Sequence, residues 1–155
     1  MINKLSDFGY NFQVKLIAAL LTDKNFLQQI SDILDYKYFE SEATSFIVKC
    51  IKSHVVEFKA PPTMEVMKVK IKELKDEVLE TSVVSSLKDA MRNVGSSDLD
   101  FIKEESIKFC KNQKLKGAIV ESVNLLESGE FDAIKVKIDE AMKAGGDRNI
   151  GHEYN

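Results

Sequence analysis

The fold of this chain is decided by the stretch Leu99–Gly145, "LDFIKEESIKFCKNQKLKGAIVESVNLLESGEFDAIKVKIDEAMKAG". Residues 99–127 contain no proline and repeat apolar side chains at helical spacing, which predicts one helix of roughly 40 Å at about 1.5 Å per residue. Ser128 and Gly129 end that helix. The segment that follows starts with acidic residues and ends in Lys143 and Gly145, as the helix dipole and glycine capping favour. Two helices with so short a break between them predict an antiparallel helical hairpin over residues 97–145.

The two arms of this hairpin are unequal, so the second can cover only part of the first. Apolar residues on the uncovered part must then pack against the rest of the chain or against another chain. We expect contact with another chain, and the alternative is packing on residues 10–95. The candidate residues of a subunit interface are Phe101, Ile102, Phe109, Leu115 and Phe131.

The preceding residues, 1–96, predict a compact helical bundle. The two prolines are adjacent, and no glycine occurs between Gly9 and Gly95, which favours helices over hairpin-rich sheets. Pro61 ends one of the predicted helices. Helix caps are expected at Asp23 or Asn25, Ser41, Thr63, and Ser96–Asp98. Apolar spacing predicts about five helices, at residues 12–20, 26–34, 46–58, 64–74 and 80–91. The fold class is therefore all-α: a compact bundle followed by a long hairpin.

Composition bounds the function classes. The 155 residues fit one domain, and 44% hydrophobic residues with nine Phe can form a sizeable core. A net charge of −3, with interspersed signs, gives no electrostatic case for nucleic-acid binding by the whole chain. Two distant cysteines fit a reducing, cytoplasmic setting. No apolar run approaches the roughly 18 residues that span a membrane, so no membrane partner is expected.

Motifs of catalysis and cofactor binding are weak. There is no GxxxxGK[ST] and no strand followed by GxGxxG, and the glycines after Ala144 are expected to cap a helix. Cys50 and His54 lie four residues apart and could form two ligands of a zinc site in a small metal-dependent enzyme. The other histidine is His152, in the tail, and a core cysteine beside a half-buried histidine is favoured. Nothing fixes a catalytic partner for Cys110. The residues therefore indicate a non-catalytic interaction domain without a cofactor or metal.

A group of lysines in the long predicted helix could contact phosphate or an acidic partner. Phe109 lies among them, while Glu104 and Glu105 precede them. A solvated helix face is the favoured interpretation. The candidate contact residues for a partner or nucleic acid are Lys108, Lys111, Lys114 and Lys116.

The segment Val14–Val66 resembles the N-terminal domain of DnaB-type replicative DNA helicases, and most closely that of T-even-like bacteriophages. The resemblance rests on "VKLIAALLTDKNFLQQISDILDYKYFESE" followed by "FIVKCIKSHVVEFKAPPTMEV". Within these, "YFES" at Tyr38–Ser41, "IKSHV" at Ile51–Val55, the pair Glu57-Phe58 and the turn at Pro62 follow the family's order. These are structural motifs and not catalytic ones.

This resemblance implies a place in DNA replication at the primosome. Such helicases are hexamers whose N-terminal domains form a collar, where hairpins of neighbouring subunits pair and primase or a loader docks. In such helicases, a separate RecA-like motor domain binds ATP, Mg²⁺ and most of the single-stranded DNA, and residues 1–155 lack that domain. The family thus implies that this segment is not an enzyme, that residues 146–155 begin the linker to the motor, and that the compartment is the cytoplasm of an infected bacterium.

A second interpretation stays within replication. The helicase-binding domain of primases has a similar design of bundle plus hairpin, so a primase fragment or a helicase loader is the alternative. The start of the domain at Met1 favours the helicase. The tail "DRNIGHEYN" is expected to be extended or poorly ordered by itself.

Overall fold

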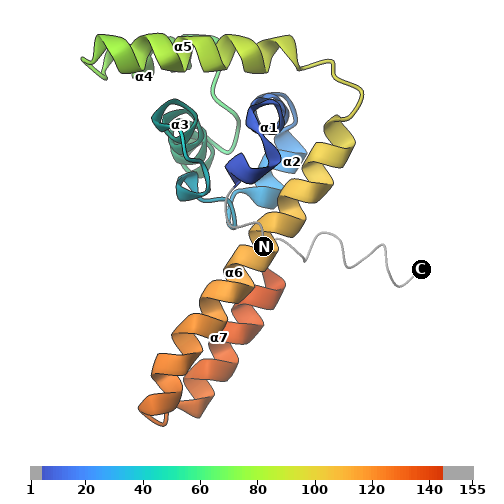
Figure 1. Cartoon of the computed structure of the whole chain (residues 1–155), viewed down its shortest axis with the longest axis vertical. Coiled ribbons are helices and arrows are strands. Elements are labelled where there is room, and N and C mark those ends of the chain that lie inside the picture. Colours follow the sequence, from blue (N-terminus) through green and yellow to red (C-terminus); the bar gives the residue numbers. More distant parts are fainter. Residues whose placement is uncertain (1–4, 145–155) are drawn as a thin grey trace.

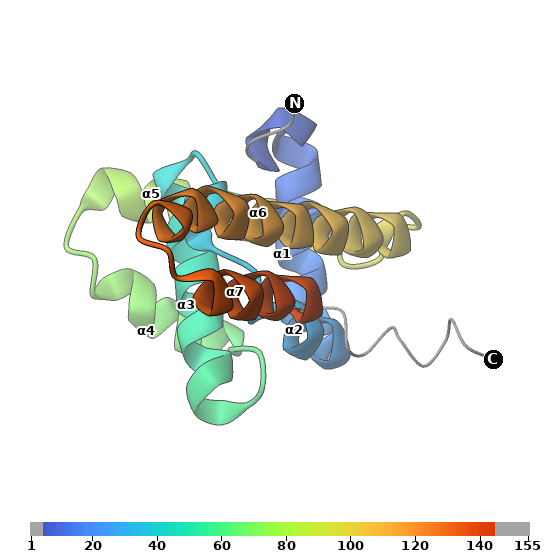
Figure 2. The ribbon, with the colours of Figure 1, turned by 90° about the horizontal axis from the view of Figure 1, so that it is seen from below.

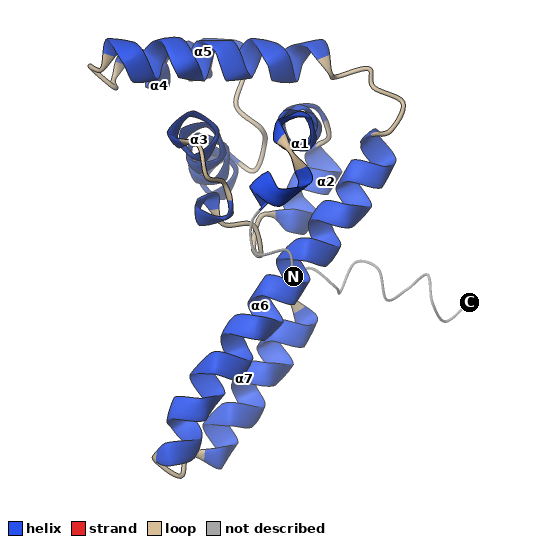
Figure 3. Ribbon diagram, in the orientation of Figure 1, coloured by secondary structure: helices blue, strands red, loops and turns tan. Residues whose placement is uncertain are grey.

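A computed structural model describes residues 5–144, and this part of the chain is all-helical, as predicted. Two short 3-10 turns, η1 (Leu5–Phe8) and η2 (Tyr36–Tyr38), accompany the α-helices. Figures 1 and 3 show a bundle from which one helical hairpin projects. The helices are α1 (Tyr10–Thr22), α2 (Lys24–Ile30), α3 (Glu42–Phe58), α4 (Met64–Lys72), α5 (Glu77–Arg92), α6 (Leu99–Glu127) and α7 (Phe131–Lys143).

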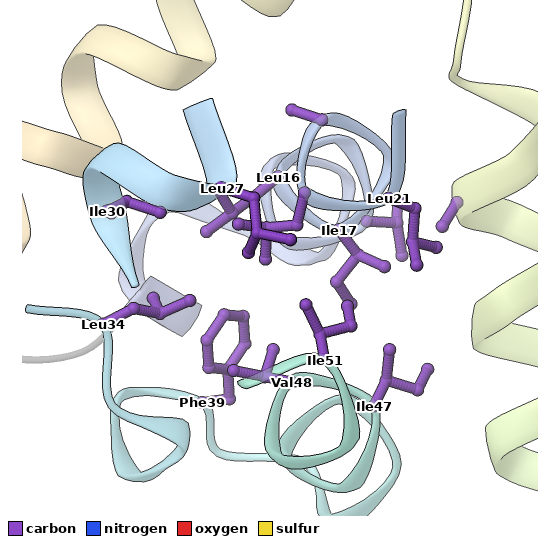
Figure 4. Packing of buried hydrophobic residues seen from close by; sticks show 14 of the residues in the cluster. Leu16, Ile17, Leu21, Leu27, Ile30, Leu34, Phe39, Ile47, Val48 and Ile51 are labelled. Carbon is purple, nitrogen blue, oxygen red and sulfur yellow. The ribbon is translucent and has the colours of Figure 1, made fainter. Parts of the chain in front are cut away.

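Helix α1 forms the centre of the bundle. Its apolar residues are buried around most of its circumference, and Leu16, Ile17 and Leu20 have no exposed surface. A helix that is apolar on most sides has to be surrounded by others. Accordingly, α2, α3, α5 and α6 all pack against it. Figure 4 shows side chains of α1 and α2 meeting Phe39 and the apolar side of α3.

The predicted caps explain where several helices begin. Asp23, Ser41 and Thr63 each accept a hydrogen bond from a backbone N–H in the first turn of the helix that follows. Helix α5 starts earlier than predicted, at Glu77, because Asp76 caps it by accepting from the N–H of Leu79.

Helix α2 is shorter than the prediction of residues 26–34, because it ends at Ile30. Ile33 and Leu34 are nevertheless buried, in the irregular segment that follows. Lys52 donates a hydrogen bond to the Leu34 carbonyl oxygen, so a side chain of α3 satisfies a backbone group of this segment that lies outside any helix. Apolar spacing was therefore correct about burial here and wrong about helix length.

Helices α4 and α5 form an antiparallel pair along one side of the bundle (Figures 1 and 2). Met67 and Ile71 of α4, and Val83, Leu87 and Ala90 of α5, are buried in the common core cluster. Helix α5 packs against both α1 and α3. The pair therefore closes the bundle on the side where α5 crosses these helices.

Helix α6 belongs to the bundle and to the hairpin at once. Its first half crosses α1 and α2 and contributes Ile102, Phe109 and Cys110 to the core cluster. Its second half leaves the bundle with α7 alongside it (Figure 1). The predicted boundary between residues 96 and 97 assigns all of α6 to the hairpin, whereas these buried residues join its first half to the bundle core.

Two ion pairs hold α6 in place. Asp98 occupies the N-cap position of α6 but makes no capping bond with its side chain, contrary to its predicted role. Its carboxylate instead accepts from Lys15 Nζ of α1 at 2.8 Å. One turn into α6, Lys103 Nζ donates to Asp23 Oδ2 at 2.7 Å. The start of the long helix is thus tied to α1 and to the cap of α2.

None of the helices described between residues 5 and 144 combines the length and apolarity that crossing a membrane requires.

Candidate protein-interaction surface on the helical hairpin

Helices α6 and α7 pack through a narrow line of small and apolar residues. On α6 the line includes Ala118, which is buried, and Ser122 and Leu125, which are half-buried. On α7 it includes the half-buried Ile134 and the buried Ala141. This line covers only one side of each helix, so the other apolar residues of the hairpin lie outside it.

A row of exposed apolar residues runs beside that line on α6. Leu115 is half-buried, while Ile119, Val123 and Leu126 are each more than half exposed. Ile119, Val123 and Leu126 each follow a residue of the contact line (118, 122 or 125) by one position, and Leu115 lies one turn before Ile119. One position is a rotation of about 100° around the helix, so the row lies along one flank of the contact line.

Helix α7 has a matching row. Phe131 and Met142 are 64% and 59% exposed, Ile138 is half-buried, and Lys135 lies between them. Met142 again follows a contact residue, Ala141, by one position, and Ile138 lies one turn before Met142. Because the helices are antiparallel, the same rotation on each brings both rows to the same side of the pair.

The opposite side of the hairpin is polar. Lys137 Nζ of α7 lies 2.8 Å from Glu121 Oε1 of α6. Both residues lie on the flank of the contact line opposite to the apolar rows. That ion pair raises the pKa of Lys137, first through its hydrogen bond to Glu121. A hollow of about 420 Å³ on this side is lined by Lys114, Glu140 and Asp32, among others. The hairpin therefore has one charged side and one apolar side. We use the term "apolar side of the hairpin" for the residues of the two rows, which are Leu115, Ile119, Val123, Leu126, Phe131, Ile138 and Met142.

The five predicted interface residues divide into three groups. Ile102 and Phe109 are 3% and 6% exposed within this chain's own core, so the prediction that they contact another chain fails at these positions. Packing on the bundle, the alternative left open by the sequence, accounts for both. Phe101 is 58% exposed on the part of α6 beside the bundle. Leu115 and Phe131 lie on the apolar side of the hairpin.

Phe109 shows what fixes the first half of α6. Its ring meets that of Tyr38 edge-on at 5.4 Å between centroids, and that of Phe8 at 6.1 Å. Burial raises the pKa of Tyr38 to about 12. Tyr38, the first residue of the "YFES" motif, therefore has a structural role here, because its ring packs against the long helix α6.

Next to this aromatic contact, a hollow of about 590 Å³ opens where α6 leaves the bundle. Phe8, Phe109, Leu115, Ile119 and Val120 form its apolar lining. It is continuous with the apolar side of the hairpin through Leu115 and Ile119. The exposed apolar surface thus extends from the projecting end of the hairpin back to the bundle.

Residues of the apolar side that the sequence prediction missed are Ile119, Val123, Leu126, Ile138 and Met142. Their signal is present in the spacing, since they continue from Leu115 and Phe131 at intervals of three, four or seven residues. Recognising them requires knowing which side of α6 faces α7, and that depends on how the two helices pack.

The four candidate lysines do not form one patch. Lys114 lines the hollow on the polar side of the hairpin, whereas Lys108 and Lys116 line the hollow beside Phe109. Lys108 Nζ also lies 3.6 Å from Glu105 Oε1. Lys111 is half-buried. A single phosphate-binding face is therefore not formed by these residues within one copy of the chain.

Cys50 and His54 both lie on α3 and are half-buried. The His54 ring packs against Phe58 at 4.6 Å between centroids, and burial raises the pKa of the Cys50 thiol. Across the described residues, no group of three or more His, Cys, Asp or Glu side chains gathers to hold a metal ion. His152, the remaining histidine, lies outside the described residues, as do Gly145 and the predicted linker 146–155.

Comparisons with models of protein families, with curated proteins and with solved structures gave no match to this chain. The resemblance to DnaB-type helicases therefore rests on the sequence motifs alone, and the surface described above has to be interpreted from its own geometry.

Proposed function

We propose that this chain is the N-terminal collar domain of a hexameric replicative DNA helicase, acting in ring assembly and in docking primase or a helicase loader. The observation that carries the proposal is the apolar side of the hairpin, which projects from the bundle on a single pair of helices. In this proposal ATP, Mg²⁺ and most contacts with single-stranded DNA belong to a motor domain.

The proposed occupant of the apolar side is the hairpin of a second copy. Its rows contain one charged residue, Lys135, so it offers little charge for a strongly charged partner to recognise. Two identical hairpins related by a two-fold axis can place the same apolar surface face to face, which is how most homodimers form. Exposed contiguous apolar surface of this kind marks sites of association.

Sedimentation equilibrium of the chain over a range of concentrations tests this pairing. The double variant Ile119→Glu/Met142→Glu places two carboxylates on the apolar side, and we expect it to be monomeric where the unmodified chain forms dimers. Val136→Glu is the matched control, because Val136 is 54% exposed on α7 but lies on the polar side. A chain that is monomeric at all concentrations, or equal weakening by Val136→Glu, contradicts hairpin pairing.

The helicase assignment has its own test. A Walker A motif on a strand–helix unit in the reading frame after residue 155 supports the collar. If the same frame encodes a primase catalytic domain, the chain is instead the helicase-binding domain of a primase. If the frame is short and its product loads helicase, the chain is instead a helicase loader. In a longer protein that carries this segment, the same double variant is expected to lower the hexamer fraction.

A further inference from the structure

A groove of about 600 Å³ lies between α4 and α5, on the part of the bundle distant from the hairpin. Five apolar side chains form it, two of them from methionines. Methionine is flexible and polarisable, so it adapts to different apolar side chains of a partner. The apolar residues are Met64, Ile71, Val84, Leu87 and Met91.

The charged residues that line this groove are all basic. They are Lys68 on α4, and Lys88 and Arg92 on α5, and no carboxylate lines the groove. Lys88 and Arg92 are separated by one helical turn, or about 6 Å along the axis. The chain as a whole carries a net charge of −3, so this basic rim is a local exception to its overall charge.

One carboxylate near the rim is already engaged. Asp89 Oδ1 accepts from Arg92 Nη1 at 2.8 Å, and its other oxygen accepts from the Tyr10 hydroxyl of α1. Asp89 thus faces α1 and does not line the groove. The guanidinium has five N–H donors, so Arg92 keeps donors for an incoming carboxylate.

We propose that the α4–α5 groove binds an acidic amphipathic helix of a partner protein. Apolar side chains at helical spacing would enter between the two methionines, as amphipathic helices bind apolar grooves. Carboxylates one turn apart on that helix would meet Lys88 and Arg92, and a further carboxylate would meet Lys68 across the groove. Cations on both rims favour an occupant with several carboxylates over one with a single anionic group. Such an occupant could be part of the primase or loader proposed above, but binding at this groove does not require the hairpin to pair.

The test uses the chain of 155 residues and a synthetic 14-residue probe peptide with Leu at positions 1, 4, 5, 8, 11 and 12 and Glu and Ala elsewhere. Matched peptides replace Glu with Gln or with Lys. Fluorescence anisotropy is expected to rank affinity in the order Glu, Gln, Lys. The variant Lys68→Glu/Lys88→Glu/Arg92→Glu should weaken binding of the Glu peptide at least about tenfold, since three exposed ion pairs become repulsions.

Two further variants separate the groove from general charge effects. Val84→Asn, a neutral polar change at a groove position 37% exposed, should weaken the Glu and Gln peptides alike while the helical circular dichroism is unchanged. Lys24→Glu/Lys37→Glu/Lys143→Glu changes the net charge as much as the groove triple does, at exposed positions outside the groove, and should leave the affinity unchanged. Equal loss in this control, an absence of binding, or tighter binding of the Lys peptide overturns the proposal.

Methyl resonances of the methionines locate the peptide. The chain has five Met, of which Met64 and Met91 line the groove and Met142 lies on the apolar side of the hairpin. The proposal requires shifts at Met64 and Met91. Shifts confined to Met142 place the peptide on the hairpin and refute the groove, whereas failed hairpin pairing in sedimentation leaves the groove result unaffected.

Discussion

Replacing Phe109 with Ala tests whether the long helix is anchored by the bundle core or held free for another chain. Phe109 is 6% exposed and contacts the rings of both Tyr38 and Phe8. Truncating a buried Phe costs about 3–5 kcal/mol of unfolding free energy, and the aromatic contacts place this site towards the upper part of that range. Phe101 lies eight residues earlier on the same helix but is 58% exposed, so Phe101→Ala should cost less than about 1 kcal/mol.

Urea denaturation followed by circular dichroism measures both variants. With a denaturant slope of about 2 kcal/mol/M, a loss of about 4 kcal/mol moves the midpoint down by about 2 M. Phe101→Ala should move it by less than about 0.5 M. If the two variants lose similar stability, or if Phe109→Ala loses less than about 1 kcal/mol, the first half of α6 is not anchored as the structure places it.

Two further predictions concern single groups. Burial raises the pKa of the Cys110 thiol to about 12, so at pH 8 only about one molecule in ten thousand carries the thiolate. We expect iodoacetamide to label Cys110 only when the protein unfolds, and to label the half-buried Cys50 before that. Peptide mass spectrometry reads both rates, and rapid native labelling of Cys110 contradicts its burial. The hydrogen bond from Lys103, and then that from the N–H of Phe26, lowers the pKa of Asp23. Because the folded pKa is the lower one, this stabilisation is present above the unfolded pKa of about 3.9 and is lost as pH falls through the folded pKa. Asp23→Asn keeps a good cap and removes the charge, so the stability difference between the two proteins should shrink below about pH 4 in urea titrations; a difference that is constant with pH assigns the effect to capping alone.

The all-α class and most helix positions could be predicted because they depend on local chemistry. Apolar spacing marked the helices, and Asp23, Ser41 and Thr63 marked their starts through bonds to backbone a few residues away. Residues 99–127 were predicted as one helix, and the structure has the same bounds. Such features need no knowledge of distant parts of the chain, so a single sequence contains them.

What the tertiary structure decided is which side of each helix is covered. Ile102 and Phe101 are neighbours of similar apolar character, yet one is in the core and the other is exposed, because α1 and α2 cover one side of α6 only. Asp98 looked like a cap and became an ion-pair partner because folding brings Lys15 of α1 beside it. The apolar side of the hairpin and the basic rim of the α4–α5 groove likewise arise where two helices meet. Periodicity fixes the apolar stripe of a helix, but only packing determines how much of that stripe remains for a partner.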